Sequence, residues 1–313
     1  MRLSYQLKEI NHRARTEPEL FLLESDVLFR RKIEEAAMWI LEHRSRSPIV
    51  LLSGPSGSGK TTIALKLEEA LRRLGVGTHA VSMDQYFCTV DPGTAPRTPK
   101  GEIDYESPAC VDWELLNRHF TMLETGEEIT VPKFEFSRNM RNDAAGRRLR
   151  VHPSEIVIFE GIHALRDTLS DRHPGAIKLY VSARSSVLDG DQVFFKNTWM
   201  RMMRRAVRDY QFRGSDVTFT LAHWANVRRG EKKYISPFKY KADILLDSSL
   251  PYEVLVMKHF APPLLAAVPE ENPRREEILR LLCAFDAFAP INPALVSDDS
   301  LLREFIGGGR YRY

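Results

Sequence analysis

A glycine-rich stretch carries the clearest chemical signal in the chain. It matches the pattern G-x-x-x-x-G-K-[ST] and consists of Gly54, Pro55, Ser56, Gly57, Ser58, Gly59, Lys60, Thr61 and Thr62. The glycines let the backbone curl so that successive N–H groups converge on phosphate oxygens. Lys60 would reach the β- and γ-phosphates, and the Thr61 hydroxyl would ligate Mg²⁺. We therefore predict that this loop binds ATP with Mg²⁺, in preference to a chance glycine-rich turn.

Two carboxylates occupy positions that suit a ligand crevice. Asp84 and Glu160 each lie at the end of a short apolar run that is predicted to be a strand. In an open parallel sheet, the carboxyl ends of the strands face the ligand. Asp84 would then accept a proton from a substrate hydroxyl, and Glu160 would hold Mg²⁺ or its water. The alternative for both is a turn or capping residue, which is common after strands.

An arginine-rich helix is predicted from residue 197 to residue 212. Its arginines recur at three- and four-residue steps and share one face, with one more just beyond the helix: Arg201, Arg204, Arg205, Arg208 and Arg213. A second face is predicted to pack inward and holds Trp199, Met203, Ala206 and Tyr210. Beside a phosphate-binding loop, the cluster favours a lid that neutralises charge on a transferring phosphoryl group. A solvated basic face and an RNA-binding surface are the alternatives.

The elements that must position these residues follow from apolar periodicity. Short apolar runs predict buried strands at residues 48–53, 79–83, 156–159, 177–181 and 244–246. Helical patterns, such as those at 28–44 and 60–74, separate most of these strands. Alternating strands and helices indicate a parallel sheet covered on both faces. We predict an α/β fold of the P-loop NTPase type, with three layers, a mostly parallel five-stranded sheet, a β-hairpin insertion and the arginine-rich helical lid.

The hairpin insertion and the two ends of the chain complete the predicted organisation. The hairpin arms are placed at 128–136 and 147–152, around residues 142–146, whose composition is typical of a turn. We expect residues 1–46 to be an N-terminal helical extension, 47–260 the P-loop domain, and 261–313 a C-terminal helical extension packed on that domain.

Composition narrows the class of protein. The chain has 313 residues, 43% of them hydrophobic, and a net charge of +3, which is typical of a globular protein. No apolar run suits a membrane span or a signal peptide, so we expect a cytoplasmic protein without a membrane partner. Three widely spaced cysteines, Cys88, Cys110 and Cys283, are interpreted as reduced thiols. We expect no nucleic-acid partner, and homo-oligomerisation stays open.

The order of several motifs resembles the uridine kinase and phosphoribulokinase family. The chain carries GPSGSGKTT, SMDQYF, DYESP, VPKFEF, VIFEGIHAL and RRAVRDYQFRG in the order of uridine-cytidine kinases, from about Pro48 to Ser249. A wider likeness through VRRGE, YKADILLDSSLPYE and LLREFIGG is similar to bacterial nucleoside kinases that often carry an additional N-terminal TGS-type domain. Here only a short helical lead is expected before the kinase core.

The resemblance implies a role for each matching residue. Asp84 would be the base that activates the ribose 5′-hydroxyl, and Thr61, Asp84 and Glu160 would surround Mg²⁺. Lys60 would act on the transferring phosphate. The hairpin carrying Phe134 would cover the nucleoside. Three arginines would touch substrate or phosphates from the lid, namely Arg205, Arg208 and Arg213.

Several positions depart from the family pattern on the acceptor side. Glu106 stands where the family has a sugar-binding Asp, and Phe134 stands where it has a Tyr near the base. Asn139 replaces a His that reads the pyrimidine. Ser215 replaces an Arg, and His223 replaces a Gln. We still expect Glu106, Phe134, Asn139 and His223 to bind substrate, with a changed preference, because buried polar groups reject a mismatched base strongly.

The sequence is compatible with three hypotheses for the function. The first is transfer of the γ-phosphoryl group of ATP to the 5′-hydroxyl of a nucleoside, with uridine or cytidine first. The second keeps the mechanism and changes the acceptor to a sugar phosphate or a pantothenate-like alcohol. The acidic segment Asp104-Tyr105-Glu106 argues against a second phosphate there. The third is a nucleotide- or RNA-binding regulatory protein without turnover, although Lys60 and Asp84 are both present.

Overall fold

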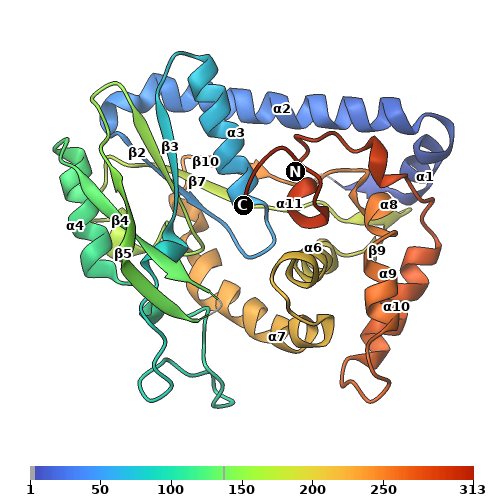
Figure 1. Cartoon of the computed structure of the whole chain (residues 1–313). Coiled ribbons are helices and arrows are strands. Elements are labelled where there is room, and N and C mark those ends of the chain that lie inside the picture. Colours follow the sequence, from blue (N-terminus) through green and yellow to red (C-terminus); the bar gives the residue numbers. More distant parts are fainter. Residues whose placement is uncertain (1–3, 137) are drawn as a thin grey trace.

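A computed structural model describes residues 4–136 and 138–313, and its elements alternate along most of the chain (Figure 1). The strands are β1 (Tyr5–Gln6), β2 (Ile49–Ser53), β3 (Thr78–Ser82), β4 (Ile129–Glu135), β5 (Met140–Leu149), β6 (Ile156–Glu160), β7 (Ile177–Ser182), β8 (Val187–Asp189), β9 (Gln192–Phe195) and β10 (Ile244–Asp247). The α-helices are α1 (Leu7–Thr16), α2 (Pro18–His43), α3 (Lys60–Arg73), α4 (Trp113–Glu124), α5 (Asp167–Ser170), α6 (Asn197–Phe212), α7 (Val217–Gly230), α8 (Glu253–Met257), α9 (Ala261–Ala266), α10 (Arg275–Asp286) and α11 (Arg303–Ile306).

The central sheet has five strands in the order β10-β7-β2-β6-β3, and every neighbouring pair is parallel. The five strands predicted from apolar runs are confirmed, each within about a residue of its expected ends. β2 is buried along its whole length because it lies in the middle of the sheet. The fold prediction of an α/β, P-loop type protein is confirmed.

The sheet separates two hydrophobic cores, which makes the fold three-layered. Val50 and Leu52 of β2 belong to a core shared with α2, α3, α6 and the C-terminal helices. Ile49 and Leu51 point the other way, into a core shared with α4 and the base of the hairpin. The alternation follows from the two-residue period of a strand. Both faces are therefore covered, and the carboxyl edge of the sheet is the part available to a ligand.

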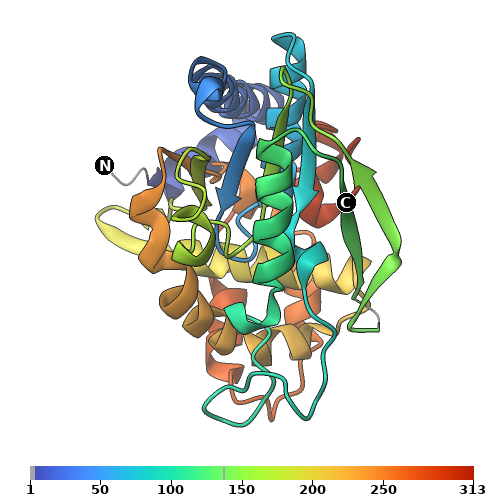
Figure 2. The same cartoon turned by 90° about the vertical axis from the view of Figure 1, so that its left-hand side faces the viewer.

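The N-terminal residues extend the first core. α2 begins at Pro18, ten residues before the expected start of a helix at residue 28. Phe21, Phe29 and Ile33 of α2 are buried together with residues of α3. Figures 1 and 2 show α2 running along one side of the molecule. No helix in the described ranges is long and apolar enough to cross a membrane.

The hairpin exists, but the predicted turn was wrong. β4 pairs with β5 so that Glu135 faces Met140, and residues 142–146 lie inside β5. The register shifts between Val131 and Lys133, opposite this segment. Pro132 stands at the shift and has no N–H to offer the ladder, so the extra residues bulge there. Figure 2 shows the hairpin at the periphery of the molecule.

Helix α6 has the predicted bounds, Asn197–Phe212, and its packing differs from the predicted pattern. Met203 and Ala206 are buried as expected, whereas Tyr210 is 55% exposed, so its assignment to the inward face was wrong. Arg201 and Arg204, which were expected to line the lid, are buried instead. The inward face is wider than predicted because two guanidinium groups find acidic partners inside the protein.

Those partners come from two other helical segments. Arg201 makes a two-pronged ion pair with Glu231, at 3.1 and 2.9 Å. Arg204 does the same with Glu253, and its Nη2 lies 2.6 Å from Oε2. Arg204 and Glu253 have side chains that are 0% and 2% exposed. Such a pair does not replace hydrophobic packing as a source of stability, but losing one partner leaves the other charge buried and uncompensated.

We predict that Arg204→Met lowers the free energy of unfolding by about 3–5 kcal/mol, because Glu253 stays buried without its partner. Urea denaturation of wild type and variant measures this. Arg280→Met, which breaks the exposed pair with Glu276, serves as the control and should change little. The double variant Arg204→Met/Glu253→Leu should recover part of the loss. Equal, small effects in both single variants would contradict the account.

Candidate active site

The phosphate-binding loop joins the buried strand β2 to helix α3, as the sequence predicted. Gly59 adopts φ = +81°, a left-handed conformation that favours glycine, immediately before the helix begins at Lys60. Gly54 allows a close approach, because a Cβ there would lie 2.2 Å from the carbonyl oxygen of Val181. The loop therefore needs glycine at two positions of the motif for reasons visible in the backbone.

The two buried arginines of α6, Arg201 and Arg204, bind backbone carbonyl groups of this loop. The Arg201 Nε donates to the carbonyl oxygen of Ser56 at 3.1 Å, and the Arg204 Nη1 donates to that of Gly57 at 3.2 Å. Two carbonyl groups of the loop are therefore bound by cations and need not face a ligand. This suits a phosphate-binding nest, in which N–H groups face the anion. Sequence reasoning placed both arginines on the wrong side of the site.

Lys60 and Asp84 lie close enough for the charge of each to affect the pKa of the other. Burial lowers the pKa of Lys60, and the negative charges of Glu160 and Asp84 oppose this lowering of the pKa. Burial raises the pKa of the Asp84 carboxyl. Lys60, Arg213 and Arg208 oppose that rise in the pKa, in this order of strength. The base predicted from the sequence is thus held among the cations that were predicted to bind phosphate.

Thr61 and Glu160 meet at the start of α3. The Thr61 Oγ1 donates to Glu160 Oε1 at 3.3 Å, so a hydroxyl and a carboxylate oxygen converge there. Glu160 also feels the charges of Lys60 and Asp84, and burial raises its pKa. Mg²⁺ needs only a few hard oxygen ligands from a protein, because it keeps several waters and takes further oxygens from phosphates. Residues 4–136 and 138–313 contain no group of three His, Cys, Asp or Glu side chains arranged for a metal.

One buried carboxylate, Asp209, organises the remaining arginines. It lies 2.7 Å from Arg208, 3.2 Å from Arg205 and 3.7 Å from Arg213, measured to guanidinium nitrogens. Sequence reasoning missed Asp209 because it considered only the basic residues of α6. The spacing of Arg205 and Asp209, four residues apart on one helix face, was the available signal. Asp209 brings the three predicted lid arginines together near Asp84.

Glu106 is a buried carboxylate beside Arg205. Its Oε1 lies 3.7 Å from Arg205, whose Nη1 also donates to the Ser56 Oγ at 3.0 Å. Burial raises the pKa of Glu106, and the charges of Arg205 and then Lys60 oppose this rise in the pKa. Among the described residues, Glu106 Oε2 is buried without a hydrogen-bond partner. This oxygen is therefore free to accept a hydrogen bond from a ligand.

Phe134 of the hairpin contacts the segment that follows Asp84. Its backbone N–H donates to Gln85 Oε1 at 2.9 Å, which ties β4 to the turn that carries Asp84. Its ring lies edge-on to Phe87, with centroids 5.7 Å apart, and to Phe136, with centroids 5.1 Å apart. Arg213 lies over the Phe136 ring, at 5.9 Å from the centroid. An aromatic wall thus stands next to the arginine cluster, and Gln85 is a second residue that the sequence did not single out.

Two predicted substrate-binding residues make their contacts elsewhere. Asn139 is exposed at the far end of the hairpin, with φ = +50°, and its carbonyl oxygen accepts from the N–H of Val90. The His223 ring bonds the carbonyl oxygen of Phe219, one turn earlier on α7, and lies against the Phe219 ring. These contacts leave both residues outside the cluster formed by Lys60, Asp84 and Glu106, and their role in substrate binding stays a prediction.

Comparisons with known proteins find similar chains among uridine kinases. A uridine kinase of Halobacterium salinarum is 27% identical over 197 residues, which cover 62% of this chain and 77% of that protein. A uridine kinase of Deinococcus deserti is 29% identical over 199 residues, covering 63% and 86%. A solved structure described as a possible uridine kinase from Bacillus stearothermophilus gives a TM-score of 0.45 at 19% identity, covering 70% of this chain and 98% of that one.

The family comparison covers the whole crevice. The match runs from residue 49 to residue 253, and so includes the phosphate loop, Asp84, Glu160 and the arginines of α6. This range is well over half of the chain. The chain belongs to the phosphoribulokinase / uridine kinase family.

Proposed function

We propose that the protein is an ATP-dependent kinase that phosphorylates the 5′-hydroxyl of a nucleoside, with uridine or cytidine as the first candidates. The observation that carries the proposal is that Lys60, in the phosphate-binding loop, and Asp84, after β3, lie close enough for each charge to act on the other. A nucleotide-binding protein without turnover needs the loop and its lysine. It has no need of a carboxylate held beside them, whereas a kinase requires one to receive a proton.

The transfer step uses few residues. The acceptor hydroxyl oxygen attacks the γ-phosphorus of ATP, the bond to the β,γ-bridging oxygen breaks, and ADP leaves. The proton of the hydroxyl goes to Asp84. Lys60 and the arginines held by Asp209 offset the negative charge that spreads over the transferring group. Catalysis of this kind rests on positioning and electrostatics, because the protein forms no covalent bond to the substrate.

Thr61 and Glu160 are the residues that we assign to Mg²⁺, with Asp84 nearby. When bound, Mg²⁺ would supply positive charge that offsets the charge of the phosphates. The chain's own part is to supply one hydroxyl and one carboxylate at the start of α3, 3.3 Å apart. Lys60 emerges from the same turn of the helix, so the ammonium group and the metal ligands share one rigid support.

The acceptor side favours a neutral polyol over a second phosphate. Glu106 offers a buried, unpartnered carboxylate oxygen, which can accept hydrogen bonds from sugar hydroxyls. A phosphate placed against the same carboxylate would be repelled. Phe134 and Phe136 of the hairpin, with Phe87 packed against Phe134, form an aromatic cluster that suits a flat base. These features support a nucleoside, and they support a sugar phosphate less well.

The acceptor is tested by screening ADP release with uridine, cytidine, adenosine, guanosine, a pantothenate-like alcohol and a pentose phosphate. We predict ATP- and Mg²⁺-dependent turnover with at least one nucleoside and none with the pentose phosphate, because Glu106 repels it. Turnover with a non-nucleoside alcohol alone would keep the kinase and change its acceptor. Nucleotide binding without turnover on any acceptor would favour a regulatory protein.

We predict that Asp84→Asn lowers kcat by at least ~10²-fold, the usual scale for a lost general base, with little change in ATP affinity. Steady-state kinetics with the best acceptor and direct ATP binding measure the two effects. Asp91→Asn, on an exposed loop further along the chain, is the matched control. Near-normal kcat in Asp84→Asn would remove this carboxylate from the mechanism.

We predict that Asp209→Asn lowers kcat by about tenfold or more, because three arginines lose the charge that holds them together and the transferring group loses their stabilisation. KM for the acceptor should change less than kcat. Asp216→Asn, which alters only the cap at the start of α7, is the control. A lowered melting temperature with unchanged kcat would mean that Asp209 is purely structural.

A further inference from the structure

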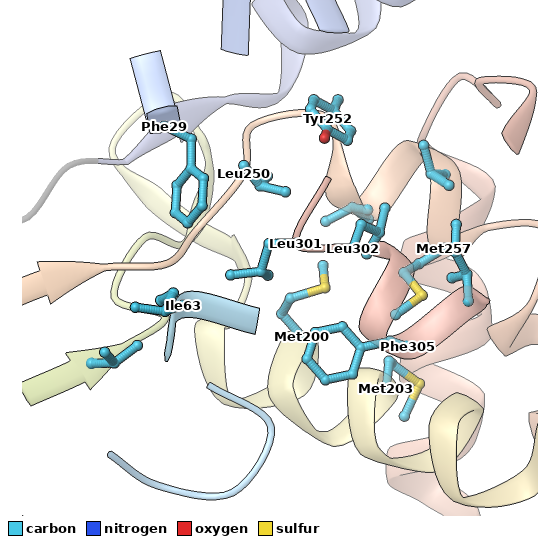
Figure 3. Close-up of a cluster of buried hydrophobic side chains, with 14 of the residues drawn as sticks. Phe29, Ile63, Met200, Met203, Leu250, Tyr252, Met257, Leu301, Leu302 and Phe305 are labelled. Carbon is cyan, nitrogen blue, oxygen red and sulfur yellow. The ribbon is translucent and has the colours of Figure 1, made fainter. Parts of the chain in front are cut away.

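The C-terminal segment, defined here as residues 297–313, lies across the beginning of the phosphate-loop helix. Figure 1 places α11 and the C-terminus beside the start of α3. Three apolar side chains anchor this segment and are fully buried: Leu301, Leu302 and Phe305. Figure 3 shows them among side chains of α3 and α6. Leu301 reaches the loop itself, because a Cβ on Gly59 would lie 2.7 Å from Leu301 Cδ1.

Glu304 of this segment binds the first turn of α3 directly. One carboxylate oxygen, Oε2, accepts from the Thr62 hydroxyl at 2.5 Å and from the Thr62 backbone N–H at 3.2 Å. The next N–H, that of Ile63, already donates to the carbonyl oxygen of Gly59. The Thr62 N–H is therefore one of the first-turn donors that have no partner within the helix and are available to an anion.

A carboxylate in this position stands where a nucleotide phosphate would bind. Thr62 closes the G-x-x-x-x-G-K-T-T motif, whose N–H groups hold the α- and β-phosphates of a bound nucleotide. Glu304 is buried, 7% exposed, and close enough to affect both Lys60 and Glu160 through its charge. Its negative charge would repel a phosphate that approached the same donors, so the two anions compete for Thr62.

We propose that Glu304 is an internal competitor of the nucleotide, so that ATP binding requires the Glu304 carboxylate to leave Thr62. This rests on the proposed function only in so far as the loop binds ATP. Free protein would then exist mainly in a state whose phosphate site is filled by its own side chain. The apparent dissociation constant for ATP equals the intrinsic one divided by the fraction of protein in the open state.

The construction of the segment suits a small movement. The apolar anchors hold residues 301–305 in the core, while Gly307 and Gly308 have φ of +77° and +71° and separate them from the tail. Polar contacts that water can replace hold the tail, residues 309–313, in place. Arg310 and the Tyr311 hydroxyl each bind Glu69 at 2.8 Å, and the Tyr313 hydroxyl lies 3.2 Å from the Thr62 hydroxyl. Rotation of the Glu304 side chain and release of the tail would therefore open the site without unpacking the core.

The direct test is ATP binding by calorimetry, in the absence of an acceptor, for wild type, Glu304→Gln and Glu304→Ala. We expect Glu304→Ala to bind ATP at least about tenfold more tightly, because the charge-assisted contact with Thr62 no longer competes. Glu304→Gln should show a smaller gain, because its amide oxygen can still accept from Thr62. Glu276→Gln, with the same charge change on an exposed part of α10, should bind like wild type.

A second measurement uses the unaltered protein and remains valid if a Glu304 variant folds poorly. Hydrogen exchange of the amides in residues 308–313 should become faster when ATP is added, because the tail loses its contacts with α3. Slower exchange in that stretch, or unchanged or weaker ATP binding by a folded Glu304→Ala, would overturn the proposal. If neither wild type nor the variants bind ATP, both this proposal and the assignment of the loop to a nucleotide are wrong. If the protein binds ATP but shows no turnover, the proposed kinase function is wrong and this proposal still holds.

Discussion

The rest of the site depends on the hydrogen bonds that two buried arginines donate to the phosphate loop. Arg201 and Arg204 bind the carbonyl oxygens of Ser56 and Gly57, and each is neutralised by its own glutamate, Glu231 or Glu253. The loop can expose its N–H groups to an anion only while its carbonyl groups are satisfied elsewhere. The cost of burying these guanidinium groups is offset by pairing, and the loop is thereby fixed before any nucleotide arrives.

The same helix then supplies the arginines that we propose to act on the phosphates. One turn beyond Arg204, the buried carboxylate of Asp209 collects Arg205, Arg208 and Arg213 on the side of α6 that faces Asp84. Helix α6 thus packs into the core through one face, which includes Met203, Ala206 and Val207, and carries the arginines held by Asp209 toward its C-terminal end. A shift of this helix would move the loop and the arginines together, which couples nucleotide binding to the arrangement of the catalytic charges.

Local signals in the sequence predicted the strands, the phosphate loop and the bounds of α6, because each is fixed by an apolar run, a spacing rule or a helical period. These signals gave wrong predictions where partners far away in the sequence determine the structure. Residues 142–146 have the composition of a turn and are held inside β5 by the pairing with β4, with the bulge at Pro132. The roles of Arg201 and Arg204 depended on glutamates 30 and 49 residues away, and that of Thr62 on Glu304, 242 residues away. No pattern in a single stretch of sequence contains such contacts.

The most direct test of the central claim is a crystal structure of the protein with uridine, Mg²⁺ and an ATP analogue that cannot transfer its γ-phosphate. The account predicts that the γ-phosphate contacts Lys60 and that the 5′-hydroxyl lies about 3 Å from the Asp84 carboxylate, within reach of proton transfer. It also predicts that the loop carbonyls of Ser56 and Gly57 still accept from Arg201 and Arg204. A bound nucleotide whose γ-phosphate points away from Asp84, with the acceptor seated elsewhere, would contradict the account.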